Sequence, residues 1–330
     1  MINVAQIGVG YWGPNLLRNL SASSRCQVAM VADRSEERRA FVGKNYPGVR
    51  TIGDASEAFA CPDIDAVVVA TPAGTHHALV MEALRNGKHV LVEKPMATSV
   101  AEVEEIGKLA SDKGLVAMVG HTFLFNPAVR ALKALVDSGE LGKVRYVYSQ
   151  RLNLGRIRSD VDALWNLAPH DISIIQYLLG DPRPQSIKRS GMDYIQPGVD
   201  DVVFLTMEYP GKILAHIHVS WLDPHKVRCL TVVGSKKMAI YDDIAEHKLA
   251  VYDKGIEPKA VLGESMDYDQ SVPPSFVHRS GDVNMPSVAW HEPLRAELDH
   301  FFDCIEGKSK CLTGPSHAAE VVRILEQAAK

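Results

Sequence analysis

The stretch Ile2-Asn3-Val4-Ala5-Gln6-Ile7-Gly8-Val9-Gly10-Tyr11-Trp12-Gly13 decides the fold of this chain. A short apolar run leads directly into Gly-x-Gly-x-x-Gly, and an amphipathic segment, 15–20, follows. This order of strand, tight turn and helix is the context that a dinucleotide-binding fingerprint requires. Gly8 permits the sharp turn, Gly10 lets the backbone approach a pyrophosphate, and Gly13 lets the helix lie close to the strand. The N-terminus of the helix offers free N–H groups to the phosphates.

An acidic residue at the correct spacing strengthens this reading. Asp33 closes the apolar run 28–32 and lies 20 residues after Gly13, where a carboxylate binds the hydroxyls of an adenosine ribose. Its charge repels a 2′-phosphate, which predicts NAD rather than NADP. The neighbouring Arg34 and Arg38 leave NADP open, because an arginine there can accommodate the extra phosphate. A glycine-rich turn that binds nothing is the alternative, but such a turn does not require Asp33.

Length and composition predict a globular protein with two domains. The chain has 330 residues, 46% hydrophobic and 23% charged, which is too long for one ordinary core. A net charge of -4 gives no general attraction to nucleic acid or to an anionic membrane. No apolar run approaches the roughly 20 residues that span a bilayer, and the start has no signal-peptide pattern. We therefore expect a cytoplasmic protein that binds neither nucleic acid nor membrane.

The cysteines predict reduced thiols rather than a disulfide framework. They are odd in number, scattered, and never arranged as C-x-x-C, which also argues against a zinc site. None has an obvious histidine partner in the sequence, so we expect no cysteine nucleophile. The five residues are Cys26, Cys61, Cys229, Cys304 and Cys311.

The pattern of apolar runs divides the chain near residue 121. Up to there, continuous apolar strands alternate with helices, which predicts a parallel sheet covered on both faces. Beyond it, several strands run in series, which predicts a largely antiparallel sheet. The predicted domains are therefore 1–121 and 122–330. The strands expected after the first are 28–32, 66–70, 89–92, 115–119, 144–151, 202–209 and 212–221; the helices are 15–20, 36–45, 78–86, 100–113, 128–138, 169–179, 294–305 and 316–329; and a long loop or arm is expected over 253–290.

Two motifs stand at predicted strand ends in the first domain. Thr71-Pro72 follows one strand and Glu93-Lys94-Pro95 follows the next, and ligands of a parallel sheet bind beyond the carboxyl ends of its strands. We therefore expect Thr71, Pro72, Glu93 and Lys94 near the nicotinamide half of a cofactor. A surface lysine paired with Glu93 is the structural alternative. His76 opens the next helix and is expected to cap it or to line the cofactor groove.

These motifs, together with His170 on a predicted helix, resemble the Gfo/Idh/MocA oxidoreductase family, and the resemblance covers essentially the whole chain. It implies an N-terminal Rossmann domain with a doubly wound parallel sheet. The C-terminal α/β domain that it implies has a large open, mainly antiparallel sheet that forms the subunit interface of a homo-oligomer, a dimer or tetramer. It implies NAD(P)-dependent oxidation or reduction of a sugar or cyclitol carbon, with Lys94 and His170 as the catalytic pair. Tyr11 and Trp12, within the fingerprint, join the expected cofactor-binding residues.

One departure from the family pattern narrows the expected substrate. Many members carry an aspartate four residues before the histidine, where this chain has Asn166. Residues four apart share a helical face, so Asn166 and His170 can meet one ligand. The Asn-x-x-x-His pattern is similar to that of the UDP-N-acetylglucosamine and UDP-N-acetylglucosaminuronate 3-dehydrogenases. A second departure is Leu124, near which many relatives place an arginine, so no contact of that arginine is carried over.

Chemistry assigns roles to the pair, with the choice of base left open. Histidine titrates nearest neutral pH and suits the general base, while a lysine ammonium stabilises a developing alkoxide. Lys94 could act as base only if desolvation lowered its pKa. The alternative is that His170 is an interior histidine whose hydrogen bonds are satisfied within the fold and that has no catalytic role.

Further substrate contacts are expected around the predicted catalytic helix. A loop before that helix is expected to hold Arg151 together with Asn153, Arg156 and Arg158. Arginines there could bind a diphosphate or uronate. The alternative is that they form a solvated basic loop with no ligand. Trp165 could stack on a sugar or uracil ring, or only close the domain junction.

His216 and His218 alternate along a strand. That spacing is compatible with a metal but is more typical of a hydrogen-bonded sheet face. Hydride transfer to NAD needs no metal, and we expect none.

The leading hypothesis is NAD-dependent oxidation of C3 of a UDP-N-acetylhexosamine, or of its uronate, to the 3-keto sugar. The alternatives are reduction of a dTDP-keto sugar, oxidation of a free sugar or cyclitol, and a non-catalytic NAD-binding sensor on the same scaffold.

Overall fold

The computed structural model describes residues 1–155, 157–159, 161–258 and 276–329, and the chain divides into two compact units. Unit 1 contains Met1–Asn126, Ile172–Asp181 and Trp290–Lys330, and unit 2 contains Pro127–Asp171 and Pro182–Ala289. A single division at residue 121 does not describe these units, since three separate segments build unit 1. The reason is packing: the two C-terminal helices lie against elements of the first 126 residues.

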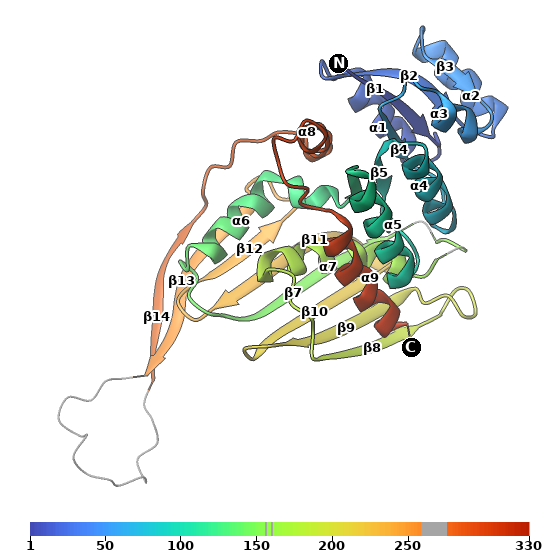
Figure 1. Cartoon of the computed structure of the whole chain (residues 1–330). Helices are drawn as coiled ribbons and strands as arrows, with labels where there is room; N and C mark the ends of the chain where they lie inside the picture. Colours follow the sequence, from blue (N-terminus) through green and yellow to red (C-terminus); the bar gives the residue numbers. More distant parts are fainter. Residues whose placement is uncertain (156, 160, 259–275, 330) are drawn as a thin grey trace. The chain divides into compact units, whose positions relative to one another are not determined.

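Unit 1 is built on a six-stranded, fully parallel sheet of order β3-β2-β1-β4-β5-β6 (Figure 1). This is the doubly wound order of a Rossmann fold, and it confirms the predicted class. The elements are β1 (Ile2–Ile7), α1 (Gly13–Ser21), β2 (Cys26–Ala32), α2 (Glu36–Asn45), β3 (Arg50–Ile52), α3 (Ala55–Ala60), β4 (Ala66–Val69), η1 (Ala73–Thr75), α4 (His76–Arg85), β5 (His89–Glu93), α5 (Val100–Lys113), β6 (Ala117–Gly120), η2 (Thr122–Phe125), α8 (Pro293–Ile305) and α9 (Pro315–Ala328).

The sequence explains these elements locally. All four residues of β4 are buried, as expected of a central strand covered on both faces. Helix α5 begins at a capping box of Ser99 and Glu102 and ends at Gly114 in the left-handed conformation, so both ends satisfy their backbone groups.

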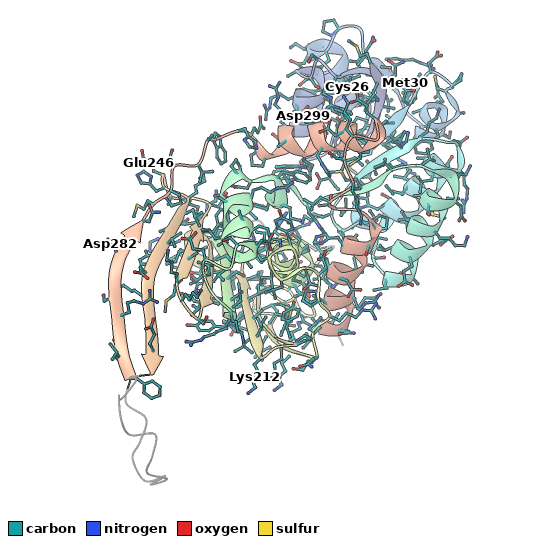
Figure 2. All side chains as sticks on the ribbon, turned by 60° about the vertical axis from the view of Figure 1, so that its left-hand side comes forward. Cys26, Met30, Lys212, Glu246, Asp282 and Asp299 are labelled. Carbon is teal, nitrogen blue, oxygen red and sulfur yellow. The ribbon has the colours of Figure 1, made fainter. Side chains whose placement is uncertain are left out.

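The C-terminal helices belong to the core of unit 1. Helix α8 packs against α1 and η2, and α9 packs against α5 and β6. Figure 2 shows Cys26 of β2 and Asp299 of α8 in the same part of the unit, where Arg25 Nη1 donates to the carbonyl oxygen of Asp299 at 2.9 Å. Elements from both ends of the chain therefore stabilise the same sheet.

Unit 2 is built on an eight-stranded sheet of order β14-β13-β12-β11-β7-β10-β9-β8 (Figure 1). All neighbouring strands are antiparallel except β7 and β10, which confirms the predicted mainly antiparallel sheet. Lys212 marks the turn between β9 and β10 in Figure 2. The elements are α6 (Pro127–Asp137), β7 (Val144–Leu154), β8 (Ser186–Met192), β9 (Val202–Tyr209), β10 (Ile213–Ser220), β11 (Leu222–Gly234), β12 (Met238–Asp242), β13 (Leu249–Pro258) and β14 (Phe276–Asn284).

The expected loop is wrong for residues 253–258 and 276–284, which are strands. Strand β13 runs to Pro258 and pairs with β14 from Phe276 to Asn284. β14 is the edge strand, and the part of β13 after Tyr252 has its ladder pairs with β14, so the glycines and the proline stand at the edge of the sheet, where they are tolerated. Residues 259–275 lie outside the described part of the chain.

Helix α7 (Ala163–Leu179) begins well before its predicted start at Pro169. Asp162 caps it, because its Oδ1 accepts the backbone N–H of Trp165 at 2.9 Å, and such a cap satisfies a donor of the first turn. Residues 163–171 of α7 belong to unit 2 and 172–179 belong to unit 1. No helix among the described residues combines the length and apolar character needed to cross a membrane.

Two helical glycines give a matched test of the fingerprint packing. A Cβ on Gly13 would lie 2.6 Å from the carbonyl oxygen of Gly8, whereas one on Gly43 of α2 would meet nothing within 4 Å. We expect Gly13→Ala to lower the free energy of unfolding by about 1–3 kcal/mol through overpacking. Gly43→Ala should raise it by about 0.5–1 kcal/mol through helix propensity. Urea unfolding of both variants checks this; equal effects of the two substitutions would contradict a close helix–strand approach at Gly13.

Candidate functional site

The fingerprint turn is held by a side chain that the motif does not include. Gly8 has a φ of +94°, and a Cβ there would lie 2.5 Å from the carbonyl oxygen of Ala70, so only glycine fits. Gln6, fully buried on β1, donates from Nε2 to the carbonyl oxygens of Gly8 and Gly13, both at 2.9 Å. The turn and the first residue of α1 are therefore fixed to one buried amide.

Gly10 differs from the other two fingerprint glycines. The nearest atom to a Cβ built on it is Arg38 Nη1, at 3.7 Å, so protein packing does not require glycine there. The open space lies beside the N-terminal end of α1, where a pyrophosphate would approach backbone N–H groups. The residues present thus fit a dinucleotide.

Asp33 is both a structural acceptor and the expected ribose ligand. Its Oδ2 accepts the backbone N–H of Val9 at 2.8 Å, and its Oδ1 accepts that of Ser35 at 2.9 Å. Each carboxylate oxygen has a further acceptor position for a ribose hydroxyl. Arg38 Nη1 lies 3.6 Å from Oδ2, and Arg34 is exposed. The carboxylate is therefore held beside the fingerprint with an arginine near it.

The other predicted cofactor residues of this loop region differ in burial. Tyr11 is 85% exposed, and Trp12 is 40% exposed and immediately precedes α1. After β4, Thr71 shares a hydrogen bond with Thr75 between their hydroxyls at 2.7 Å, and Pro72 is exposed. Tyr11, Trp12 and Pro72 are thus accessible to a ligand.

Glu93 ends β5 and Lys94 follows it. The Glu93 carboxylate accepts the backbone N–H of Lys94 at 3.3 Å and a hydrogen bond from the side chain of Trp12. Burial raises the pKa of Glu93 to about 7, against the opposing effect of the Lys94 charge. A carboxyl that titrates near neutral pH therefore lies beside the predicted catalytic lysine, as is common at functional sites.

His76 has a different place from the expected groove lining. It is 1% exposed; its Nδ1 lies 2.7 Å from the carbonyl oxygen of Pro95, and its Nε2 lies 2.8 Å from that of Thr71. Burial lowers its pKa. His76 therefore joins the loops after β4 and β5.

The sequence analysis missed Glu297, a buried carboxyl of unit 1. It is fully buried on α8, and its Oε2 accepts the Thr122 hydroxyl at 2.8 Å. Burial, and then the negative charge of Glu93, raise its pKa well above the ordinary value. Its position among the apolar residues Leu294, Leu298 and Phe301 of the helix is a signal that could have revealed it.

Two buried histidines also escaped notice. The rings of His121 and His317 meet edge to face with centroids 5.2 Å apart, and His317 Nδ1 lies 2.8 Å from Asp181 Oδ1. Burial lowers the pKa of His121 well below the ordinary value, with further contributions from His317 and Lys94. This group lies within the electrostatic reach of Lys94.

In unit 2, Asn166 and His170 lie one turn apart on α7, and both are half-buried. The indole Nε1 of Trp221 donates to Asn166 Oδ1 at 3.3 Å. Trp221 is buried in the core. Its hydrogen bond therefore fixes the orientation of the Asn166 side-chain amide, with Oδ1 toward Trp221. The predicted shared helical face of Asn166 and His170 is present.

Arg151 does not lie in the expected loop. It lies within β7, as the predicted strand 144–151 indicates, and is buried, with Nε 2.6 Å from Asp171 Oδ2 and Nη2 3.5 Å from Oδ1. A buried guanidinium requires such a partner, so this arginine serves the fold. Asp171 points toward β7, as its position next to His170 on a helix predicts.

The remaining predicted substrate residues lie in β7, in the segment before α7 and in the first turn of α7. Asn153 is half-buried within β7 rather than in the loop after it, because the strand runs to Leu154. Arg158 is exposed, and its carbonyl oxygen accepts from Gln196 Nε2 at 2.9 Å. Trp165 is half-buried in the first turn of α7. Arg156 lies outside the described residues.

The histidines of β10 belong to a stacked sheet face. His216 Nδ1 lies 2.9 Å from the Thr206 hydroxyl, and both His216 and His218 stack on Phe204, with centroids 6.1 and 4.2 Å away. Within the described ranges, no three ligand-type side chains come close enough to hold a metal ion.

Comparison with known proteins gives two family matches that follow one another along the chain. Residues 2–121 match the Gfo/Idh/MocA model described as an oxidoreductase family with an NAD-binding Rossmann fold, and residues 129–240 match the C-terminal domain of that family. Trans-1,2-dihydrobenzene-1,2-diol dehydrogenase of Bos taurus is 31% identical over 68% of this chain and 68% of its own length.

Two further similarities mark the range of the family. A 4-carboxy-2-hydroxymuconate-6-semialdehyde dehydrogenase of Sphingobium is 33% identical over 54% of this chain, and the match spans only 59% of that relative's length. A solved UDP-N-acetylglucosamine 3-dehydrogenase from Acidithiobacillus ferrooxidans superposes with a TM-score of 0.81 and 23% identity, covering 99% of this chain and 97% of that one. At this identity the similarity establishes the fold and not the substrate.

The raised pKa of Glu297 has a consequence for stability. A carboxyl whose pKa is higher in the folded than in the unfolded state stabilises the fold at low pH, and this contribution is lost as pH rises toward the folded pKa. Glu297→Gln keeps an acceptor for Thr122 and removes the titration. From about pH 5 upward, we expect the free energy of unfolding of the unaltered chain to fall faster than that of Glu297→Gln, by up to about 1.4 kcal/mol per pH unit.

Urea unfolding between about pH 5 and about pH 8 measures this difference. Glu37→Gln is the matched control, because Glu37 is an exposed carboxylate on α2 and its loss should leave the pH profile unchanged. Parallel profiles for the unaltered chain and Glu297→Gln would contradict a raised pKa of Glu297.

Proposed function

This chain belongs to the Gfo/Idh/MocA oxidoreductase family, and from that premise we propose that it oxidises, with NAD, the C3 hydroxyl of a UDP-N-acetylhexosamine or of its uronate to the 3-keto sugar nucleotide. The observation that carries the proposal is the helical turn that joins Asn166 and His170, combined with Lys94 at the end of β5.

The cofactor half of the proposal rests on the fingerprint turn. The open space at Gly10 and the two hydrogen bonds that hold Asp33 beside Val9 and Ser35 suit the pyrophosphate and adenosine ribose. We propose NAD as the preferred cofactor because the Asp33 carboxylate would repel a 2′-phosphate. Bound NAD supplies the acceptor for the hydride that leaves the sugar carbon.

The chain's own residues then manage the proton and the charge. We propose His170 as the general base that removes the hydroxyl proton, since an imidazole titrates near neutral pH. The Lys94 ammonium would stabilise the negative charge that develops on the oxygen. Glu93, which lies beside Lys94, titrates near pH 7 and would balance the lysine charge when ionised.

The choice of substrate rests on Asn166. A carboxylate one turn before the histidine would anchor a protonated imidazole, whereas an amide cannot, so Asn166 is better suited to hydrogen-bonding a substrate group. The side chain of Trp221 holds Asn166 in one orientation. Arg158 and Trp165, exposed and half-buried near the start of α7, are proposed contacts for the diphosphate and a ring.

The sheet of unit 2 supports a proposed homo-oligomer. Tyr146, Tyr148, Phe204 and Leu214 are each between 40% and 44% exposed, and Leu214 of β10 is paired in register with Tyr146 of β7. Contiguous exposed apolar side chains of this kind favour association with a second copy.

A substrate panel tests the reaction. With NAD, we expect NADH absorbance to rise with UDP-GlcNAc or with its uronate, and to rise far less with NADP. Scyllo-inositol with NAD is the control for oxidation of a free cyclitol, and a dTDP-keto sugar with NADH is the control for the reductase alternative. Turnover of neither UDP sugar, or preferred turnover of a control, would contradict the substrate assignment.

Single and double variants test the two catalytic roles. We expect Lys94→Met and His170→Ala each to lower kcat by about 10²–10⁴-fold, with NAD affinity retained for His170→Ala. If both residues act on one hydroxyl, the double variant should lose far less than the product of the single losses. Fully multiplicative losses would mean that the two residues act in separate steps.

A further inference from the structure

Two cysteines of unit 1 form a pair that their sequence positions do not suggest. Cys304 lies in the last turn of α8, and Cys311 lies in the link that leads to α9. Each thiol shifts the pKa of the other, and the residue after Cys311, Leu312, is hydrogen-bonded to the histidine that contacts Cys304. Cys304 is 8% exposed, and Cys311 is half-buried.

A histidine completes the group, which corrects the expectation that no cysteine has a histidine partner. His300, one turn before Cys304 on α8, has its Nε2 3.5 Å from Cys304 Sγ. The backbone N–H of Leu312 donates to the same nitrogen at 3.0 Å, so that nitrogen is an acceptor. Phe125 packs against the ring with centroids 5.3 Å apart, which further fixes the orientation of the imidazole.

The two thiols are not equivalent. The hydrogen bond from Cys311 lowers the pKa of Cys304, and the same contact raises that of Cys311. Two other thiols behave differently: burial raises the pKa of the buried Cys26 to about 11 and also raises that of the half-buried Cys229. Because the thiolate is the nucleophile, Cys304 is the thiol best prepared to react.

We propose that Cys304, Cys311 and His300 form an oxidation site at which a hydroperoxide converts the two thiols to a disulfide. Cys304 is the attacking sulfur, Cys311 is the resolving sulfur, and His300 is a positioning residue whose Nε2 contacts the Cys304 sulfur; the proton lost from the Cys304 thiol ends in the water that leaves. This site is independent of the proposed sugar chemistry.

The chemistry balances with hydrogen peroxide as the oxidant. The Cys304 thiolate attacks one peroxide oxygen, the O–O bond breaks, and the released hydroxide takes up the proton to leave as water. The Cys304 sulfenic acid is then attacked by the sulfur of Cys311: the S–S bond forms, the S–O bond breaks, and a second water leaves. Two thiols lose two hydrogens in total, and one peroxide becomes two waters.

The site adjoins elements that build the sheet and the candidate site. The link that carries Cys311 is joined to β6 by a hydrogen bond from the Val119 N–H to the Thr313 carbonyl oxygen at 2.9 Å. Helix α8, which carries Cys304, also carries Glu297. A disulfide would therefore tie the end of α8 to a segment that is already fixed to the sheet.

Peptide mapping of the full chain after peroxide treatment tests the proposal. Trypsin cleaves after Lys308 and Lys310, so the disulfide would join peptide 296–308 to peptide 311–323, and alkylation of the remaining thiols before digestion shows which cysteines stayed reduced. We expect the linked peptides to form at least about tenfold faster than Cys229 is lost, because of the greater thiolate fraction of Cys304. Dithiothreitol should restore both thiols.

Serine variants separate the two roles. With Cys311→Ser, we expect Cys304 to stop at the sulfenic acid, which dimedone traps. With Cys304→Ser, Cys311 should oxidise no faster than Cys229. Cys229→Ser is the matched control, since Cys229 is half-buried like Cys311. The yield of linked peptides from the Cys229→Ser variant should equal that from the unaltered chain.

Two outcomes would overturn the proposal. One is oxidation of Cys304 and Cys311 at the rate of Cys229 in the unaltered chain. The other is the absence of a dimedone adduct on Cys304 in Cys311→Ser, when thermal unfolding shows that this variant is folded.

Discussion

The hydrogen bonds from the backbone N–H groups of Val9 and Ser35 to the Asp33 carboxylate are the interactions on which the cofactor site depends. They join the end of β2 to the turn between β1 and α1, and they place a negative charge beside that turn. The buried amide of Gln6 holds the same turn from the other side. Together these contacts fix the fingerprint before any ligand binds, so little ordering of the loop remains to oppose binding.

The second half of the candidate chemistry depends on carboxyls kept out of water. Burial raises the pKa of both Glu93 and Glu297, and the negative charge of Glu93 raises the pKa of Glu297 further. The electrostatic surroundings of Lys94 therefore include His121 and Glu93, groups on two neighbouring strand ends, β6 and β5. Helix α8, from the far end of the chain, packs against α1 and η2 of unit 1 and carries Glu297.

The sequence was sufficient for the fold class and for the fingerprint, because those depend on local order: an apolar strand, a glycine turn and a helix. Helices α2 and α5 were predicted with the bounds that the structure has, since their caps are local. The start of α7 was not, because Pro169 suggested a helix start and the cap of Asp162 was overlooked. Some contacts could not be identified from residue spacing alone, because they join distant parts of the chain or successive turns of a helix. These are the contacts of Arg151 with Asp171, of Glu297 with Thr122 and of Cys304 with His300. The separate segments of unit 1 escaped prediction for the same reason.

In the proposed reaction, the hydrogen on C3 of the sugar leaves as a hydride. The most direct measurement uses UDP-GlcNAc carrying deuterium at C3, with mass spectrometry of the reduced cofactor. One deuterium is expected in the NADH formed, together with a 3-keto sugar nucleotide that lacks it. NADH without deuterium, or deuterium retained in the sugar product, would contradict hydride transfer from C3.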